Sequence, residues 1–260
     1  MKKKDPSRPF TIFITGASSG FGHSIALCYA RKGVLLCLCG RNATRLNKTA
    51  RECKKKGAEV EIFICDTREA MKLKRYMNKH TFDLVFANAG VSVGSSGFLD
   101  ENEEQTRYVF ETNVIGTMNT VWPAIEQMRE RKSGQIVITS SLTGYVGLPG
   151  APAYSASKAA LKNWGAALRG WLKKDGIKVN VICPGFMKSP MTDPNPFPMP
   201  LIMTTTKAAK IVKKGVERNK GRICFPWPMT LLVWFASVLP ASVADFIMRT
   251  LPKKTTGGLG

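Results

Sequence analysis

The stretch "TGASSGFG", residues 15–22, follows the first apolar run of the chain and is compatible with two different chemistries. Its centre, "GASSG", matches the G-x-S-x-G motif, in which a serine, here Ser18, is the nucleophile of a hydrolase. Its three glycines, spaced G-x-x-x-G-x-G, also fit a turn that brings backbone N–H groups and the positive end of a helix close to a phosphate. The remainder of the chain decides between them.

The histidines argue against the hydrolase. In α/β hydrolases an acidic residue and then a histidine follow the serine in chain order, and the serine comes after several strands. Here Ser18 follows the first strand-like run, and the two histidines of the chain, His23 and His80, precede most of the expected elements. We therefore expect a phosphate-binding turn. Its residues are Gly16, Ser18, Ser19, Gly20, Phe21 and Gly22.

Short apolar runs alternate with longer helical patterns along the chain. The runs span residues 10–15, 34–39, 60–65, 82–87, 134–140 and 177–183. The helical patterns span 20–32, 42–56, 67–79, 100–131, which is either one helix or a broken one, and 153–174. Gly33, Gly57 and Gly176 stand where helices commonly end with a left-handed residue. Continuous apolar strands separated by helices are typical of a parallel sheet covered on both faces. The sequence therefore predicts a single α/β domain built on a doubly wound parallel sheet.

The sequence contains no linker or internal repeat that would divide this domain. We expect the domain to cover residues 1–226. Within it, a Pro- and Met-rich loop at about residues 184–203 is expected to cover the substrate and to contain no regular element. Residues 227–260 are expected to form a hydrophobic, helical C-terminal extension of the same domain.

The composition is that of a soluble globular protein with a strong excess of positive charge. Of the 260 residues, 44% are hydrophobic and 22% charged, and 39 Lys and Arg against 18 Asp and Glu give a net charge of +21. Such a charge attracts anionic partners, but the basic runs lack the helix-turn-helix, finger or stacking signatures of nucleic-acid binding. We expect these runs to be solvated surface or to meet an anionic partner, and we disfavour nucleic acid as the main partner.

The seven cysteines form an odd set without a C-x-x-C pair, and most of them lie inside apolar strand-like runs. This pattern predicts reduced, buried thiols in a cytoplasmic protein, and no metal site. The basic N-terminus is followed by an apolar run too short for a signal peptide, so no export signal is expected.

The segment "YSASK" brings Tyr154 and Lys158 onto one face of a helix, four residues apart. An ammonium group beside the phenol would lower the pKa of the phenol toward neutrality and make it a usable general acid or base. Ser141 stands thirteen residues before the tyrosine, at the carboxyl end of the fifth strand. Open parallel sheets bind their ligands at that edge.

A set of motifs in a fixed order resembles the short-chain dehydrogenase/reductase family over about residues 10–225. The motifs are "TGASSGFG", "NAG" at 88–90, "TN" at 112–113, "SS" at 140–141, "YSASK" at 154–158 and "PG" at 184–185. The resemblance implies a Rossmann-like fold with Tyr154 as the catalytic acid and base. It also implies that Lys158 holds the nicotinamide ribose, that Ser141 binds the reacting oxygen, and that Asn113 holds a water in a proton relay. Ser140 is the alternative to Ser141, which the spacing to the tyrosine favours.

The same resemblance implies a nicotinamide dinucleotide in the turn at residues 15–22 and along the neighbouring strand ends. Beyond the turn, the residues expected to bind it are Arg41, Arg45, Asp66 beside the adenine, Asn88, Ala89, Gly90, Tyr154, Lys158, Pro184, Gly185 and Met187. NAD enzymes of this architecture end the second strand with a carboxylate, which would repel a 2′-phosphate. Here Gly40 takes that position and Arg41 follows it, with Arg45 nearby, so we expect NADP(H).

The expected substrate loop offers an apolar and adaptable lining. Its lining residues are Phe186, Met187, Met191, Phe197, Met199 and Met203. Ser189 or Thr192 is expected to contact the nicotinamide amide. The sequence thus predicts a homodimer or homotetramer that transfers a hydride between NADP(H) and the carbonyl/alcohol pair of a small hydrophobic substrate. A non-catalytic NADP-binding regulatory or interaction protein is the alternative.

The C-terminal apolar run from Met229 to Leu239 is about half the length needed to span a bilayer, and Pro240 ends it. Residues 241–251 follow with an amphipathic pattern. Three roles remain open for this segment: a lid over the active site, a dimer contact, or an interfacial anchor on an anionic membrane surface. The last role would make a cytoplasmic protein membrane-associated.

Overall fold

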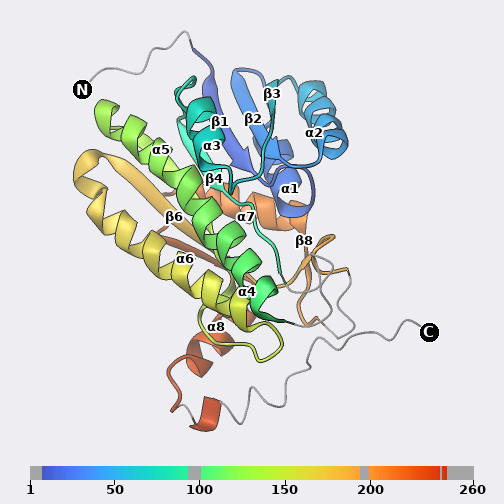
Figure 1. Cartoon of the computed structure of the whole chain (residues 1–260), viewed down its shortest axis with the longest axis vertical. Helices are drawn as coiled ribbons and strands as arrows, with labels where there is room; N and C mark the ends of the chain where they lie inside the picture. Colours follow the sequence, from blue (N-terminus) through green and yellow to red (C-terminus); the bar gives the residue numbers. More distant parts are fainter. Residues whose placement is uncertain (1–7, 93–100, 194–198, 241, 245–260) are drawn as a thin grey trace.

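The structure is a computed structural model of the chain, and it describes residues 8–92, 101–193, 199–240 and 242–244. Seven parallel strands form one sheet in the order β3-β2-β1-β4-β5-β6-β9, which confirms the doubly wound α/β domain (Figure 1). The strands are β1 Phe10–Thr15, β2 Val34–Gly40, β3 Glu59–Ile64, β4 Leu84–Ala87, β5 Gly134–Thr139, β6 Ile177–Pro184 and β9 Arg222–Phe225.

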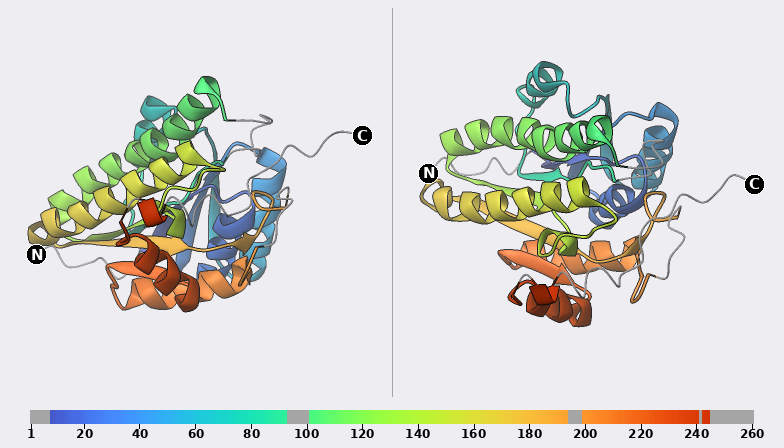
Figure 2. Two further views of the ribbon diagram at one scale, coloured as in Figure 1. Left: turned by 90° about the horizontal axis from the view of Figure 1, so that it is seen from below. Right: turned by 60° about the horizontal axis from the view of Figure 1, so that its bottom comes forward.

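Helices cover both faces of the sheet (Figure 1). One face carries α1 Gly20–Tyr29, α2 Ala43–Lys55 and α7 Thr205–Glu217; the other carries α3 Ala70–Met77, α4 Glu103–Phe110, α5 Gly116–Arg131 and α6 Pro152–Trp171. The short helical turns are η1 Glu111–Ile115, η2 Leu142–Gly144 and η3 Lys173–Asp175. The last helix, α8 Trp227–Ala236, lies at one end of the molecule, on the side of β9 and α7 (Figure 2).

The core lies on both faces of the sheet because alternate residues of each strand point to opposite sides. In β1, Ile12 and Ile14 belong to the apolar cluster formed with α1 and α7, whereas Phe13 belongs to the cluster formed with α3 and α5. All three side chains are fully buried. This burial on both sides explains why the strands appear in the sequence as continuous apolar runs rather than alternating ones.

Two elements, α7 and β9, go beyond the prediction. They occupy residues 205–225, where the sequence suggested solvated basic surface or contact with an anion. Lys207, Lys210 and Lys214 of α7 are exposed, whereas Lys213 reaches the end of α1. The buried residues of α7 are Ala208, Ala209, Val212, Gly215 and Val216. β9 then adds a seventh strand beside β6.

Two further segments add detail to the prediction, and a third lies mostly outside the described residues. The helical pattern at residues 100–131, in which a break was allowed, is divided into α4 and α5 by the π-helical turn η1. The expected substrate loop is not free of regular structure, because β7 Met187–Lys188 and β8 Met203–Thr204 pair in a small parallel sheet. Most of the amphipathic pattern at 241–251 lies outside the described residues. Within the described part of the chain, no helix is long and apolar enough to cross a membrane.

Candidate active site

A cavity of about 250 Å³ opens at the carboxyl ends of the strands, where β1 and β4 are neighbours and the order of the sheet reverses. Open α/β sheets bind ligands at this point. Of the predicted cofactor-binding residues, all except Gly185 line this cavity, whereas the predicted catalytic residues Asn113 and Ser141 lie outside its lining. The cavity also borders Gly40, Asn42, Cys65, Thr67, Val91, Thr112, Thr139, Ser140, Ser189, Pro190 and Met191.

The glycine turn between β1 and α1 forms one wall of the cavity. Gly16 and Gly20 have φ angles of +68° and +54°, left-handed values that favour glycine. A Cβ on Gly22 would lie 2.1 Å from the carbonyl oxygen of Gly16, so the turn can close only without a side chain there. α1 begins at Gly20, and the side chain of its N-cap residue, Ser19, makes no hydrogen bond to the first turn. The first N–H groups of α1 therefore fit the pyrophosphate of a dinucleotide.

Charged side chains gather at the end of the cavity beyond β2 and β3. The Nη1 atom of Arg41 lies 2.7 Å from the hydroxyl oxygen of Tyr108 and 3.6 Å from Oδ2 of Asp66. Asp66, expected beside the adenine, pairs with Arg68 at 3.0 Å. Burial alone would raise the pKa of the Asp66 carboxyl, but the hydrogen bonds from Arg68 outweigh burial and lower it. Sequence reasoning missed Tyr108 because only the folded chain brings it to Arg41, 67 positions away. It also missed Arg68, although this residue lies only two positions from Asp66.

Tyr154 and Lys158 of α6 line the opposite end of the cavity. The Lys158 ammonium donates a hydrogen bond to the carbonyl oxygen of Thr139 at 3.0 Å and lies 5.6 Å from the centre of the Tyr154 ring. Burial lowers the pKa of Lys158 to about 8. Burial raises the pKa of Tyr154 to about 12, although a hydrogen bond with Ser141 opposes the rise. The prediction that the phenol pKa is brought toward neutrality is wrong in this structure, because loss of hydration of the phenolate on burial raises it.

The two serines after β5 differ in their contacts. The hydroxyl of Ser140 donates to the carbonyl oxygen of Lys158 at 2.7 Å, so this serine fastens α6 to the end of the strand. The hydroxyl of Ser141 contacts Tyr154 and donates to the carbonyl oxygen of Pro184 at 3.4 Å. Ser141 is therefore the serine that lies beside the phenol.

Asn113 lies in η1 and is fully buried. Its Nδ2 atom donates to the carbonyl oxygen of Val91 and to Oγ of Ser157, both at 3.0 Å, and its Oδ1 atom accepts from the N–H of Val91 at 2.8 Å. The side chain thus ties the segment after β4 to α6. A Cβ on Gly90 would lie 3.1 Å from Oδ1 of Asn113 and 3.3 Å from Nζ of Lys158, so these groups are closely packed. The water relay that the resemblance implies stays a prediction.

The chain has clear relatives among known proteins. The family model described as short chain dehydrogenase matches residues 10–196. The chain belongs to this family. An uncharacterized oxidoreductase of Myxococcus xanthus (strain DK1622) is 39% identical to it over 246 residues, which cover 93% of this chain and 97% of that relative. Human 17-beta-hydroxysteroid dehydrogenase 13 is 28% identical over 251 residues, which cover 92% of this chain and 82% of the human protein.

Solved structures share the fold. A short-chain dehydrogenase from Sphingobium yanoikuyae in complex with NADPH has a TM-score of 0.78 and 22% identity, and the match covers 94% of this chain and 96% of that one. A short chain dehydrogenase from Mycobacterium paratuberculosis bound to NAD has a TM-score of 0.75 and 24% identity, with 86% and 98% covered. The protein is thus an oxidoreductase of the short-chain dehydrogenase family, a family that uses a nicotinamide dinucleotide.

In this short-chain dehydrogenase, the segment after β6 brings Met187, Ser189 and Met191 to the cavity. The hydroxyl of Thr192 donates to the carbonyl oxygen of Met187 at 2.6 Å and so holds the segment together. Of the two residues expected near the nicotinamide amide, Ser189 is therefore the one that lines the cavity. Of the other residues predicted to line the substrate site, Phe197 lies outside the described residues. The ones that are described but do not line the cavity are Phe186, Met199 and Met203.

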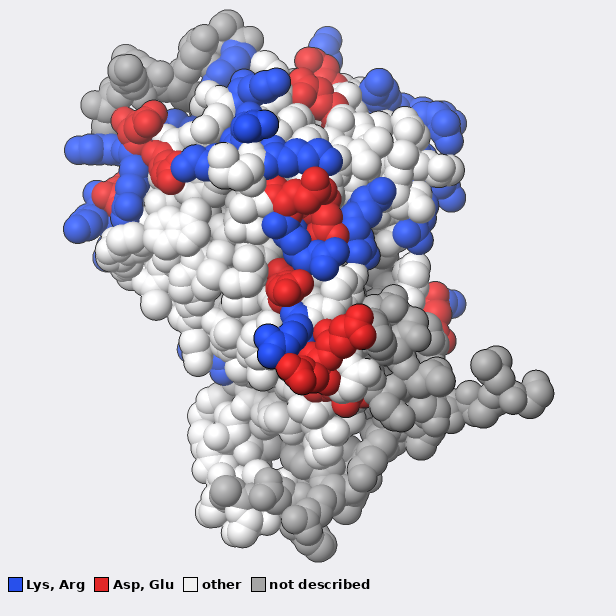
Figure 3. Space-filling model, viewed as in Figure 1, with Lys and Arg blue, Asp and Glu red and all other residues white. Residues whose placement is uncertain are grey.

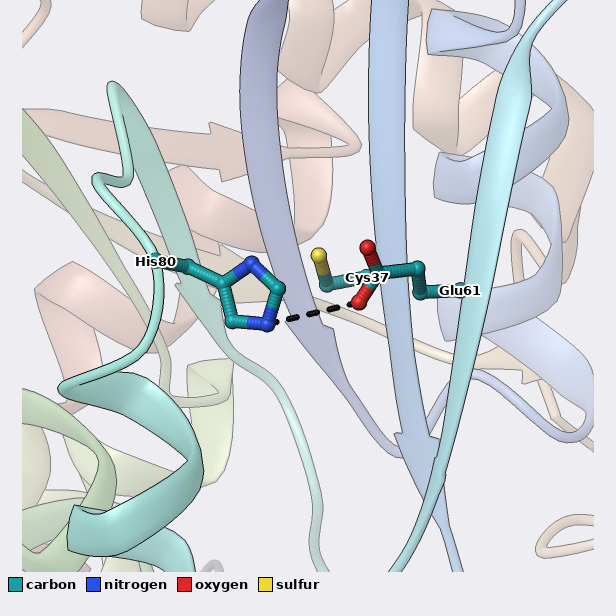
Figure 4. Close-up of side chains that lie close together, drawn as sticks. All are labelled: Cys37, Glu61 and His80. Carbon is teal, nitrogen blue, oxygen red and sulfur yellow. Dashed lines mark ion pairs between the residues drawn. The ribbon is translucent and has the colours of Figure 1, made fainter.

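A second group of polar side chains lies away from the cavity, between β2, β3 and the segment before β4 (Figure 4). Potential ligand atoms of Cys37, Glu61 and His80 all lie within 4.8 Å of one another. The Nε2 atom of His80 lies 3.3 Å from Oε2 of Glu61, and the Tyr76 hydroxyl donates to the same oxygen at 3.3 Å. Burial raises the pKa of Cys37 to about 12, so its thiol retains the proton that a metal would have to displace. The ion pair and the hydrogen bond account for this group, and we assign it no metal.

Proposed function

We propose that the protein is an NADP(H)-dependent reductase or dehydrogenase that transfers a hydride between the cofactor and the carbonyl/alcohol pair of a hydrophobic substrate. The observation that carries this proposal is that Tyr154 and Lys158 line one end of the dinucleotide cavity, with Ser141 hydrogen-bonded to the phenol. These side chains supply a proton donor, a buried cation and a hydrogen bond close to one another. Besides the hydride, reduction of a carbonyl group requires a proton donor, and it is helped by a cation and a hydrogen bond close to the reacting oxygen.

The chemistry follows from the state of each group. Bound NADPH would supply the hydride, and NADP⁺ would accept it in the opposite direction. The Tyr154 phenol, whose pKa is raised to about 12, keeps its proton at neutral pH and donates it to the substrate oxygen. The Ser141 hydroxyl hydrogen-bonds the same oxygen and orients it. Lys158 presents its charge beside the ring and favours the phenolate that remains after proton transfer.

Charge at the end of β2 supports NADP(H) over NAD(H). Gly40 leaves this strand without a terminal carboxylate, and a Cβ there would lie 3.4 Å from Ser18, so packing alone does not demand glycine. Arg41 and Arg45 both line the same end of the cavity. A guanidinium group can bind a 2′-phosphate through two hydrogen bonds. Structures of this fold hold either NAD or NADPH, so these side chains carry the preference.

An apolar substrate is supported by the segment that closes the cavity. Met187 and Met191 offer flexible apolar side chains next to the catalytic end. The human relative is named for 17-beta-hydroxysteroids, which are bulky apolar alcohols. A hydrophobic ketone or aldehyde, or the corresponding alcohol, fits this lining better than a sugar does.

Turnover by the purified full-length chain tests the proposal. Oxidation of NADPH, followed by its absorbance, is expected with hydrophobic ketones or aldehydes, and it should be slower with NADH. Sugars and other polar carbonyl compounds serve as controls. Tight binding of NADPH without turnover of any compound in a broad library would instead favour the alternative, a non-catalytic NADP-binding protein.

We also propose that the working form is a homodimer joined through the exposed apolar face of α8. α8 contains no charged residue, and the hydroxyls of Thr230 and Ser237 donate to backbone carbonyls of the same helix segment. Met229 and Val233 pack inward. Its large apolar side chains that are 52% to 76% exposed are Trp227, Leu231, Leu232, Trp234 and Phe235. A helix that is apolar on all sides is typical of a buried position, so another surface must cover it.

A second copy of the chain fits this surface better than a membrane does. Interfacial helices combine an apolar face with a basic one, and α8 has no basic face. On the face drawn in Figure 3, Lys and Arg gather over the upper part of the molecule, and the described surface at the lower end, where α8 lies in Figure 1, shows no charged residue. Two chains of net charge +21 can meet at such an end with little repulsion. The expected cytoplasmic location stays a prediction.

A further inference from the structure

Two cysteines face each other across neighbouring strands, next to the active site. β6 and β9 run parallel, and their register pairs Cys183 with Cys224. Paired residues of adjacent strands lie roughly 5 Å apart and point to the same face, which is within the range of Cα separations that a disulfide bridges. Both cysteines belong to one apolar cluster, and their thiols hydrogen-bond each other. Cys183 is followed directly by Pro184, which lines the cofactor cavity.

The groups around Cys224 favour its thiolate. The Tyr145 hydroxyl lies 3.5 Å from Sγ of Cys224, and Nη1 of Arg222 lies 3.4 Å from that hydroxyl. Lys162 places its ammonium 4.0 Å from the centre of the same ring. The hydrogen bond from Cys183, with that of Tyr145 and the charges of Arg222 and Lys162, lowers the pKa of Cys224. These contacts favour the thiolate at this sulfur.

Cys183 has the complementary properties. It is fully buried, and its hydrogen bond to Cys224 together with burial raises the pKa of its thiol. Cys224 is only half-buried, so a small reagent reaches this sulfur first. The other cysteines differ from Cys224, because burial raises the pKa of each of their thiols. They are Cys28, Cys37, Cys39, Cys53 and Cys65.

We propose that Cys224 and Cys183 form a dithiol site for hydroperoxides, with Cys224 as the attacking sulfur and Cys183 as the resolving thiol. The Cys224 thiolate attacks hydrogen peroxide, so that an S–O bond forms, the O–O bond breaks and hydroxide leaves. Cys183 then attacks the sulfenic sulfur, an S–S bond forms, and the Cys183 proton departs with the sulfenic oxygen as water. Two thiols are oxidised to one disulfide, and one peroxide is reduced to two waters.

The site is tested on the full-length protein with hydrogen peroxide. The treated protein should lose two of its seven free thiols, and an unreduced digest should contain the peptides of Cys183 and Cys224 joined. Treatment with a dithiol reductant should separate them. In Cys183→Ser, a 1,3-dione probe should label a sulfenic acid at Cys224, and in Cys224→Ser neither the joined peptides nor a label at Cys183 should form. The matched control Cys28→Ser changes a half-buried cysteine outside the pair and should leave the joined peptides unchanged.

The effect of the neighbouring cations on the Cys224 thiol is tested by its rate of alkylation. Alkylation of Cys224 by iodoacetamide should be several-fold slower in Arg222→Met than in the wild-type chain, because the pKa of the thiol rises. Circular dichroism confirms that each variant is folded. The proposal is overturned if a folded wild-type chain yields no joined peptides, if it accumulates higher oxides of Cys224 instead, or if Cys183 is oxidised equally well in Cys224→Ser.

Discussion

Burial moves the pKa values of Tyr154 and Lys158 in opposite directions, up to about 12 for the phenol and down to about 8 for the ammonium, because each side chain loses water around its charged form. At neutral pH the tyrosine is therefore a phenol and the lysine is mostly an ammonium. As the pH rises, the lysine loses its proton first. The order of these two titrations fixes how the reduction depends on pH.

The pH dependence should report Lys158. Its pKa is lowered, so the charge that favours the phenolate is present below about pH 8 and is lost as the pH rises through that value. We expect kcat/KM for NADPH, which reports the free enzyme, to be level below this pH and to fall above it. Initial rates of carbonyl reduction across the pH range measure the profile. The Lys158→Met variant should have a lower kcat/KM, and its pH profile should lack the fall near pH 8. A wild-type profile that stays level through pH 8 would contradict the role given to the charge of Lys158.

Tyr154→Phe should lower turnover by ~10³, because the phenol proton is used only in the chemical step. NADPH affinity, measured by fluorescence titration, should change little. Tyr29→Phe is the matched control, since the Tyr29 hydroxyl is buried without a hydrogen-bond partner and lies at the far end of α1. Full turnover in Tyr154→Phe would remove the tyrosine from the mechanism.

Arg41→Ala should narrow the gap between the affinities for NADPH and NADH by ~1.5 to 3 kcal/mol, the range of charge-assisted hydrogen bonds. The variant should lose affinity for NADPH and not for NADH, because NADH has no 2′-phosphate. Arg51→Ala removes an exposed arginine from α2 and should leave both affinities unchanged. Equal affinities for the two cofactors in the wild-type chain would show that Gly40 and Arg41 do not select NADP(H).

The sequence could predict the residues with local signatures but not the partners that hold them. Tyr154 and Lys158 are linked by helical spacing, and Ser141 by its place at a strand end. Nothing local, in contrast, connects Arg41 with Tyr108, which lies on a different element 67 positions away. The predicted pKa of Tyr154 was wrong because the spacing to Lys158 is visible in the sequence, whereas the burial that raises the pKa of the phenol is not.

Helices and strands were predicted correctly where one sequence signal, such as an apolar run, dominates. The six expected strands are continuous apolar runs, and they all form the sheet. α7 was missed because its buried stripe consists of small residues, such as Ala208 and Ala209, among many lysines. β9 has only four residues and begins with Arg222. η1 is a π-helical turn within a continuous helical pattern, and the periodicity of the sequence does not predict such a turn.

The position of α6, which carries the catalytic tyrosine, depends on one glycine. A Cβ on Gly165 would lie 2.5 Å from Cγ2 of Val181 in β6, so the helix approaches the sheet only without a side chain there. Gly165→Ala should lower the free energy of unfolding by ~1 to 3 kcal/mol, the cost of overpacking, and should also lower turnover. Chemical denaturation measures the first effect.

A second glycine of the same helix provides the control. Nothing lies within 4 Å of a Cβ at Gly170, so Gly170→Ala should stabilise the protein by about 0.5 to 1 kcal/mol through helix propensity alone. If the two variants change the stability in the same direction, close packing at Gly165 is not what positions α6.

Across the whole molecule, the charges and the apolar surface are separated. The chain carries +21, yet α8 has no charge and exposes large apolar side chains at one end, beside the edge strand β9. A stable interface buries roughly 800 Å² on each partner, which is more than a single short helix offers. The surface next to α8 must therefore contribute as well.

The homodimer is tested by the mass of the protein in solution. Analytical ultracentrifugation of the wild-type chain should give a dimer at both low and high salt, because an uncharged interface does not depend on screened attraction. Leu232→Glu, at a side chain that is 69% exposed on α8, should give a monomer, since two carboxylates would be buried without partners. Met71→Glu, at a side chain that is 67% exposed on α3, should leave the dimer intact. A wild-type monomer that sediments with anionic vesicles, and loses this binding in Leu232→Glu, would instead assign the same apolar surface to a membrane.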